Sequence, residues 1–232
     1  AVWNTFWISL LSLVFLFPAP ILLALLLNEV RVHLFKRVVQ TLLYLPHFLS
    51  WISVIGIAYA FYSLYGPLND LRVALGGEGT ERIMFIAEQS MFVPNVILLN
   101  LWKEVGWGTI IFLAAIASVD PQLYDSAKMD GASRWQTVRY VDFPAIVPTI
   151  VILFILSMGS ILGTGFEKVF LMQNTLNLPI SEVISTYVYK IGIVSNQFSY
   201  SAAIGLFNTV INFIFLYAVN LLSRRLSNIS LW

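Results

Sequence analysis

Residues 123–144 read LYDSAKMDGASRWQTVRYVDFP, a charged, helix-forming segment between two long apolar segments. The whole chain is 59% hydrophobic and only 11% charged, whereas a soluble domain carries about 25% charged residues. One water-soluble core cannot hide that much apolar surface. The chain is therefore predicted to be an all-α polytopic membrane protein, and residues 123–144 (the charged island) are predicted to stay in water.

Composition narrows the kind of partner. The formal net charge is +1, so nucleic acid is not a favoured partner, whereas the apolar composition requires membrane lipid. There is no cysteine, which excludes disulfides and thiolate metal sites. The two histidines, His33 and His47, are too few for a metal site, and His47 is interpreted as a polar group of the protein interior.

Five apolar segments are long enough to cross a bilayer, which takes about 20 residues. They cover residues 1–28, 41–65, 91–118, 145–163 and 200–223. Pro18 and Pro20 interrupt the first segment and are expected to kink it, because proline frees backbone carbonyls within a helix. The chain starts Ala-Val-Trp-Asn, close to this apolar run and without a Met, so we expect a further N-terminal helix to be absent.

The distribution of Lys and Arg predicts the orientation in the membrane. Eight lie on the side of the charged island: Arg31, Lys36, Arg37, Lys128, Arg134, Arg139, Arg224 and Arg225. Four lie on the other side: Arg72, Arg82, Lys168 and Lys190. Because cytoplasmic loops carry the excess of positive charge, the island and the C-terminus are predicted to be cytoplasmic.

The charged island has local signals for two helices. The Asp-Pro pair at 120–121 predicts a helix over 121–130, with the Asp as N-cap and the Pro in the first turn. Gly131 is expected to bend or end it. A second helical piece is predicted over 133–141, and Pro144 marks the entry to the next span. Small side chains would allow another surface to approach closely, although a plain solvated loop with helical character is the alternative interpretation.

The spacing within the island resembles a known motif. Asp125-Ser126-Ala127 is followed by three residues, Gly131, nine residues, Val141, one residue and Phe143-Pro144. The cytoplasmic coupling motif of binding-protein-dependent ABC importer permeases reads Glu-Ala-Ala, three residues, Gly, nine residues, Ile, one residue and Leu-Pro. Every spacing is kept, and the departures are conservative: Asp for Glu, Ser for the first Ala, Val for Ile and Phe for Leu.

Further stretches resemble the carbohydrate branch of that family, in particular permeases for uronate-type, pectin-derived or alginate-type glycans. Near the island these are Asp130-Gly131-Ala132 and Trp135, and elsewhere they are residues 28–30, 40–50, 102–111, 181–189 and 198–208. The resemblance implies that residues 1–232 form a single type I ABC importer transmembrane domain. It places five spans here, a sixth N-terminal span outside the chain, and a cytoplasmic coupling-helix loop at 120–144. The implied function is to import an oligosaccharide through the bacterial plasma (inner) membrane, and acidic oligomers of alginate or uronate are the narrower interpretation.

The resemblance also implies partners. These are a second homologous permease that completes a heterodimer, two cytoplasmic ATPase subunits and an extracytoplasmic solute-binding protein. The chain has no Walker-type phosphate-binding motif, so it is not expected to be an enzyme or to hold a cofactor, and ATP and Mg²⁺ are expected in the ATPase. Asp125 would orient the coupling helix by pairing with a basic group. The residues expected to contact the ATPase are Asp125, Ser126, Ala127, Lys128, Met129, Asp130, Gly131 and Ala132.

Polar and aromatic residues in the third span suggest a substrate path. Lys103 and Glu104 lie about ten residues into it, where charge is costly and often functional. Alternatively the helix starts later and Lys103 reaches the interface. Amides bond to sugar hydroxyls and aromatic faces stack on sugar rings, although aromatic residues near a boundary also serve as membrane anchors. The candidate path residues are Asn95, Asn100, Trp102, Lys103 and Trp107.

Two other classes of membrane protein fit the sequence less well. An ion-coupled secondary transporter would need charged residues near the midplane and inverted repeats, but the spans carry almost no charge and no convincing repeat. A membrane scaffold or an intramembrane enzyme would show paired His, Asp or Ser-Lys groups within the spans, and these are lacking. Lys103 is the only basic residue within a predicted span. The prediction that the glycan is acidic therefore depends on that residue and on the resemblance.

Overall fold

The structure is a computed structural model, and it describes residues 1–77, 79–227 and 229–231. Those residues form helices and connecting loops, with no strand among them. Within this part of the chain, five stretches are long and apolar enough to cross a membrane: Val2–Asn28, Trp51–Gly76, Gln89–Ala117, Arg134–Met158 and Phe198–Arg225. The predicted all-α fold with five spans is therefore confirmed.

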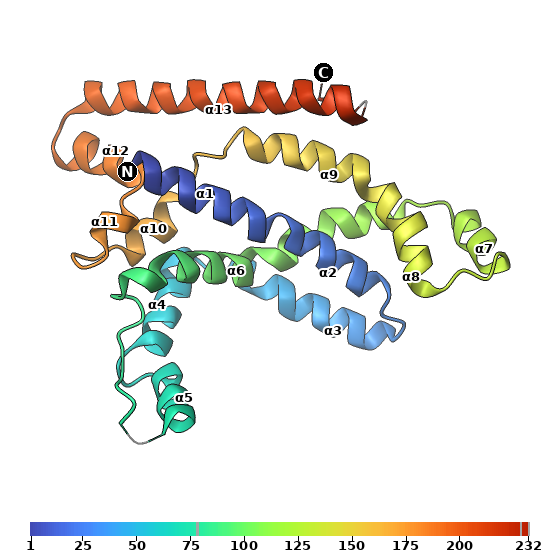
Figure 1. Ribbon diagram of the computed structural model, residues 1–232, viewed down its shortest axis with the longest axis horizontal. Coiled ribbons are helices and arrows are strands. Elements are labelled where there is room, and N and C mark those ends of the chain that lie inside the picture. Colours follow the sequence, from blue (N-terminus) through green and yellow to red (C-terminus); the bar gives the residue numbers. More distant parts are fainter. Residues whose placement is uncertain (78, 228, 232) are drawn as a thin grey trace.

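The first span consists of two helices, α1 (Val2–Leu16) and α2 (Pro18–Asn28). Phe17 joins them with helical dihedral angles, and its N–H still bonds to the Leu13 carbonyl at 3.2 Å. Pro18 lies in the first turn of α2, where a missing N–H costs least. Figure 1 shows α2 continuing in nearly the same direction as α1, so the interruption at the prolines is mild.

The predicted bounds of the second span, 41–65, are wrong. Helix α3 (His33–Tyr44) begins within the polar link and ends after four residues of the predicted span. A short 3-10 helix, η1 (Leu45–Phe48), follows, and then α4 (Trp51–Tyr62) and α5 (Pro67–Gly76). The chain turns sharply between α3 and α4 (Figure 1).

Local chemistry explains this break. Pro46 has no N–H to donate and disfavours the α-helical conformation of the residue before it. Ser50 is extended and acts as the N-cap of α4, where its hydroxyl accepts from the Ser53 N–H at 3.2 Å. Hydropathy is high on both sides of the break, which is why an apolar run alone did not reveal it.

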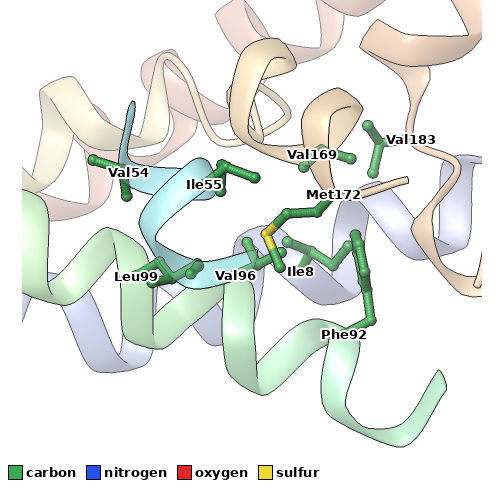
Figure 2. Packing of buried hydrophobic residues seen from close by; sticks show 10 residues of the cluster. Ile8, Val54, Ile55, Phe92, Val96, Leu99, Val169, Met172 and Val183 are labelled. Atoms are coloured by element: carbon green, nitrogen blue, oxygen red, sulfur yellow. The ribbon is translucent and has the colours of Figure 1, made fainter. Parts of the chain in front are cut away.

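Helix α6 (Gln89–Ala117) is the central element of the bundle. Its outer half contributes Phe92, Val96 and Leu99 to an apolar cluster that also takes residues from α1, α4 and the outer loop. Figure 2 shows these side chains converging: Ile8, Val54, Ile55, Phe92, Val96, Leu99, Val169, Met172 and Val183. Lipid tails are as apolar as these side chains, so close van der Waals packing, rather than removal from water, holds the helices of this half of the bundle together.

The inner half of α6 packs in a second cluster with α2 and α9. This cluster contains Ile21, Ala24, Phe112, Ile116 and Ile146. Helix α3 also lies against α6, at Gly106, where any Cβ would collide with the Leu43 carbonyl. The last span, α13 (Phe198–Ser227), runs beside α9 (Figure 1) and holds no buried residue in its apolar window. Its apolar side chains are therefore available to lipid or to a neighbouring subunit.

The loop between α9 and α13 is folded rather than open. It contains α10 (Phe166–Met172), α11 (Leu178–Ser181), α12 (Ile184–Tyr189) and a π-helical turn, η3 (Lys190–Val194). Asn177 is fully buried there, and its amide donates to the Met172 carbonyl at 2.9 Å and to the Ile86 carbonyl at 3.2 Å. The Asn174 amide donates to the same Ile86 carbonyl at 3.3 Å, so the two side chains tie the loop to the segment before α6.

Candidate functional site

The first half of the charged island folds as its sequence predicts. Helix α7 spans Pro121–Met129, and the Asp120 side chain accepts from the Gln122 N–H at 2.9 Å as an N-cap. Gly131 follows with φ of +72°, a conformation that favours glycine. The Ala132 N–H then bonds back to the Ala127 carbonyl at 2.9 Å, which closes the helix end. The predicted helix and glycine bend are confirmed.

The second half of the island is continuous with the fourth span. Ser133 and Gln136 form a capping box that starts α8 (Arg134–Thr137). This helix runs through a π-helical segment, η2 (Val138–Asp142), into α9 (Phe143–Met158). The predicted separate piece over 133–141 is therefore wrong in its C-terminal end. The Phe143 N–H bonds to the Val138 carbonyl, so the wider turn carries the helix past Pro144, which has no N–H.

The expected ATPase-contact residues lie on an exposed surface. Of these, Ala127 and Ala132 are half-buried, and the others are exposed: Asp125, Ser126, Lys128, Met129, Asp130 and Gly131. Asp125 pairs with Lys128 on its own helix at 3.2 Å, and both side chains are about three-quarters exposed. Such a pair contributes little to stability. Met129 is 88% exposed and Trp135 71% exposed, so apolar side chains face outward here.

Lys103, one of the predicted path residues, is bound within the bundle. Its side chain is buried, and its ammonium donates to the His47 carbonyl at 2.6 Å. It also lies 3.3 Å from Glu104, whose other carboxylate oxygen is 2.8 Å from His47 Nδ1. Trp107 stacks on the His47 ring with 4.3 Å between centroids. These residues brace the break at η1 against α6.

The remaining predicted path residues lie in different surroundings. Asn95 is buried and donates to the Phe85 carbonyl at 3.2 Å. Trp102 is 44% exposed on the outside of α6. Asn100 lines a pocket of about 280 Å³. The structure thus brings Lys103 and Trp107 together around His47 and places Asn100 elsewhere.

The pocket at Asn100 (the polar pocket) is lined by α1, α6, the end of α9 and the start of the outer loop. Its polar lining residues are Ser9, Ser12, Asn100, Ser157, Ser160, Thr164 and Lys168. The hydroxyls of Ser9 and Thr164 are buried and make no hydrogen bond within the described chain. Buried polar groups normally have a partner. The polar pocket therefore holds binding capacity that the chain itself does not use.

Lys168 is the cationic side chain of the polar pocket, and the sequence did not single it out. It lies on α10, outside the five spans, with its ammonium 5.6 Å from the centre of the Trp51 ring. Burial lowers the pKa of Lys168 to about 8, and the charge of Glu104 opposes that shift. The ammonium is thus mostly protonated at neutral pH, although it is partly desolvated.

The chemistry of the polar pocket suits binding. Hydroxyls and an amide bond to sugar hydroxyls, and an ammonium forms a charge-assisted hydrogen bond with a carboxylate. In the part of the chain that the structure describes, no three His, Cys, Asp or Glu side chains are grouped so that they could hold a metal ion. The pocket offers recognition of a hydroxylated, anionic molecule.

Comparison with known proteins is consistent with these features. Residues 17–228 match the family model of the binding-protein-dependent transport system inner membrane component. Protein LplB of Bacillus subtilis (strain 168) is 44% identical over 223 residues, which are 96% of this chain and 69% of that protein. The polygalacturonan/rhamnogalacturonan transport system permease protein YteP of the same strain is 47% identical, over 96% of this chain and 68% of that protein.

Solved structures agree with the sequence relatives. The crystal structure of a bacterial ABC transporter involved in the import of the acidic polysaccharide alginate contains a similar chain. Its TM-score is 0.93 at 40% identity, over 98% of this chain and 79% of that chain. A bacterial alginate ABC transporter in complex with alginate pentasaccharide-bound periplasmic protein gives a TM-score of 0.94 at 40% identity, over 100% of this chain and 80% of the other. The chain belongs to the family of binding-protein-dependent transport system inner membrane components.

Proposed function

We propose that this chain is a permease subunit of an ABC importer that carries an acidic oligosaccharide, such as an alginate or uronate oligomer, into the cytoplasm. As a multi-pass inner-membrane permease of this family, it works with a second permease, with ATPase subunits and with a solute-binding protein. Two of its relatives are named for polygalacturonan/rhamnogalacturonan and for alginate. ATP and Mg²⁺ are bound by the ATPase, and this chain supplies the path.

The polar pocket is the observation that carries the substrate class. Its hydroxyls and the Asn100 amide can replace the water around a sugar ring. Lys168 adds a single positive charge in partly desolvated surroundings, where a charge-assisted bond to a carboxylate gains strength. A neutral sugar would use the hydroxyls but gain nothing from that charge. The pocket therefore favours a glycan that carries carboxylates.

The charged island supports the proposed contact with the ATPase. Helix α7 lies at one end of the molecule, far from α11 and α12 at the other end (Figure 1). Its exposed Leu123 and Met129 present apolar surface to a partner. In this proposal α7 lies in a groove of the ATPase, and closure of the ATPase dimer on ATP moves α7 as a rigid body.

An ion-coupled secondary transporter, the alternative function, would need charged groups that are free to exchange an ion or proton near the midplane. In α6 the charged pair Lys103 and Glu104 is instead bonded to His47 and its carbonyl. That pair has a structural use, so its presence does not favour ion coupling.

The test is ATP hydrolysis by the reconstituted complex of this chain with its partner permease, the ATPase and the solute-binding protein. Alginate pentasaccharide, galacturonate oligomers and neutral arabino-oligosaccharides form the panel. An acidic oligomer should stimulate hydrolysis, and Lys168→Gln should raise its half-maximal concentration roughly tenfold or more, since a hydrogen bond to a charged group is lost. Lys190→Gln is the matched control, because Lys190 pairs with Glu182 at 3.0 Å outside the polar pocket. Stimulation by neutral oligomers alone would contradict the proposal.

A further inference from the structure

A single side-chain hydrogen bond connects α7 with the base of the fourth span. The Tyr124 hydroxyl donates to Asp142 Oδ1 at 2.5 Å. Tyr124 lies in the middle of α7, and Asp142 is the last residue of the π-helical segment that precedes α9. Among the described residues, no other side-chain hydrogen bond joins α7 to another helix.

Asp142 is fully buried, and its second oxygen, Oδ2, has no hydrogen-bond partner within the described chain. A buried carboxylate is costly unless it is bonded, so the Tyr124 hydroxyl carries much of its compensation. Losing that donor leaves the carboxylate without a side-chain donor. The bond therefore has more weight than an exposed contact of the same length.

The donor keeps its proton under all physiological conditions. Burial, the hydrogen bond to Asp142 and the charges of Asp142 and Glu29, in that order, raise the pKa of Tyr124 well above its usual value. The phenol is thus a permanent donor.

Without this bond, no side-chain hydrogen bond among the described residues would join α7 to another helix. Figure 1 shows it standing apart from the long helices. One flanking loop contains Gly131, with φ of +72°, where the chain can bend. A π-helical segment, such as the one ending at Asp142, is a common place for a helix to bend or adjust. A movement of α7 could therefore be lost in these joints.

We propose that the Tyr124–Asp142 hydrogen bond makes α7 and α9 move as one body. Tyr124 and Asp142 are then positioning residues that couple ATP hydrolysis to the membrane bundle. The inference rests on the proposed function of α7 as the contact with the ATPase. It adds the route by which the movement enters the fourth span. Neither residue needs to touch the substrate or the ATPase for this role.

The test measures the movement of the fourth span relative to α6 and needs no sugar. The chain has no cysteine, so spin labels can be placed at Leu156 on α9 and Leu98 on α6, both about half exposed. The label distance is measured in the reconstituted complex before and after MgATP is trapped with vanadate. The wild-type complex should change its label distance, and Tyr124→Phe, which removes only the hydroxyl, should lose more than half of that change. ATPase co-purification and hydrolysis without sugar should persist.

Three variants make the result specific. Tyr140→Phe is the matched control, since Tyr140 is an exposed tyrosine of the same π-helical segment, and it should leave the distance change intact. Asp142→Leu removes the acceptor without leaving a buried charge and should behave as Tyr124→Phe does. Asp142→Asn keeps an oxygen that can accept, so it should retain most of the change. The number of oligosaccharides taken up per ATP hydrolysed should fall about tenfold in Tyr124→Phe and in Asp142→Leu, because a hydrogen bond to a charged group is lost.

The possible outcomes distinguish the proposed role of the Tyr124–Asp142 bond from the proposed contact of α7 with the ATPase. A wild-type distance change in Tyr124→Phe would overturn the inference, and so would a wild-type complex that shows no change. Loss of ATPase co-purification in both Tyr124→Phe and Asp142→Leu would also overturn it, because the bond would then serve assembly. If Ala127→Trp left ATPase binding and the distance change intact, the proposed role of α7 itself would fail.

Discussion

Raising the pH from 7 to 9 should weaken the uptake of an acidic oligosaccharide, because it discharges Lys168. Burial lowers the pKa of this group to about 8, and only the protonated form attracts a carboxylate. The contribution of this charge to binding is therefore fully present well below pH 8 and is lost as the pH rises through that value. The charged fraction falls from about 0.9 at pH 7 to about 0.1 at pH 9, which corresponds to about a tenfold loss of affinity.

The charged groups near Lys168 do not change the direction in which its binding responds to pH, because burial is the largest cause of its lowered pKa. Glu104 favours the ammonium form, whereas Lys103 lies 5.5 Å from the same Trp51 ring that Lys168 approaches at 5.6 Å. A bound carboxylate would itself favour the ammonium and move the loss of binding to a somewhat higher pH. Binding still weakens as the pH rises, since the Glu104 carboxylate and the carboxylate of the oligosaccharide both stabilise the ammonium form.

The assay is the concentration of acidic oligomer that half-saturates uptake into proteoliposomes, measured at pH 7 and at pH 9. Lys168→Arg is the control, because a guanidinium stays charged across this range and should remove most of the pH dependence. Lys168→Gln should bind weakly at both values. If Lys168→Gln kept the full wild-type loss between pH 7 and pH 9, another group would be titrating, and the assignment of Lys168 to the path would be refuted.

Other substitutions test the packing and the island. Gly131→Val should cost about 1–3 kcal/mol because of its positive φ and should weaken co-purification of the ATPase, and unchanged co-purification would contradict the close approach proposed there. Gly106→Leu should lower the midpoint of thermal unfolding through a collision with the Leu43 carbonyl, an overpacking cost of about 1–3 kcal/mol, whereas Gly56→Ala, which meets nothing within 4 Å, should not. Lys103→Met should destabilise the complex by about 1–3 kcal/mol in the same thermal assay, since it leaves a buried carbonyl without its donor; a neutral effect would show that the bond has no structural weight.

The charged island was readable from sequence because its structure depends on neighbours in the chain. An Asp before a Pro and a Gly at a helix end each act within a few residues of the chain. The end of the second helix was not readable, since it depends on how a π-turn accommodates Pro144. The span count followed from hydropathy, and the break at residues 45–50 did not, because apolar residues flank it on both sides.

The polar pocket could not be predicted, because no single element carries its pattern. Ser9, Asn100, Ser157 and Lys168 come from four helices and meet only when the bundle folds. Sequence could mark Lys103 as an unusual charge within a span, but it could not show that the His47 carbonyl already binds its ammonium. A charged group is free for a ligand only if no other group of the protein binds it, and the tertiary structure decides which groups come close to it.

Helix α9 joins the two features that this fold places far apart. Asp142 lies just before its first residue, and Ser157, near its last, lines the polar pocket. Fifteen residues at 1.5 Å each separate them by about 22 Å. Helix α6, which packs in both apolar clusters, carries Asn100, which also lines the polar pocket. If the Tyr124–Asp142 bond moves the base of α9, the far end moves Ser157 relative to Asn100. Movement imposed in the cytoplasm would then change the shape of the pocket that we propose as the binding site for the sugar.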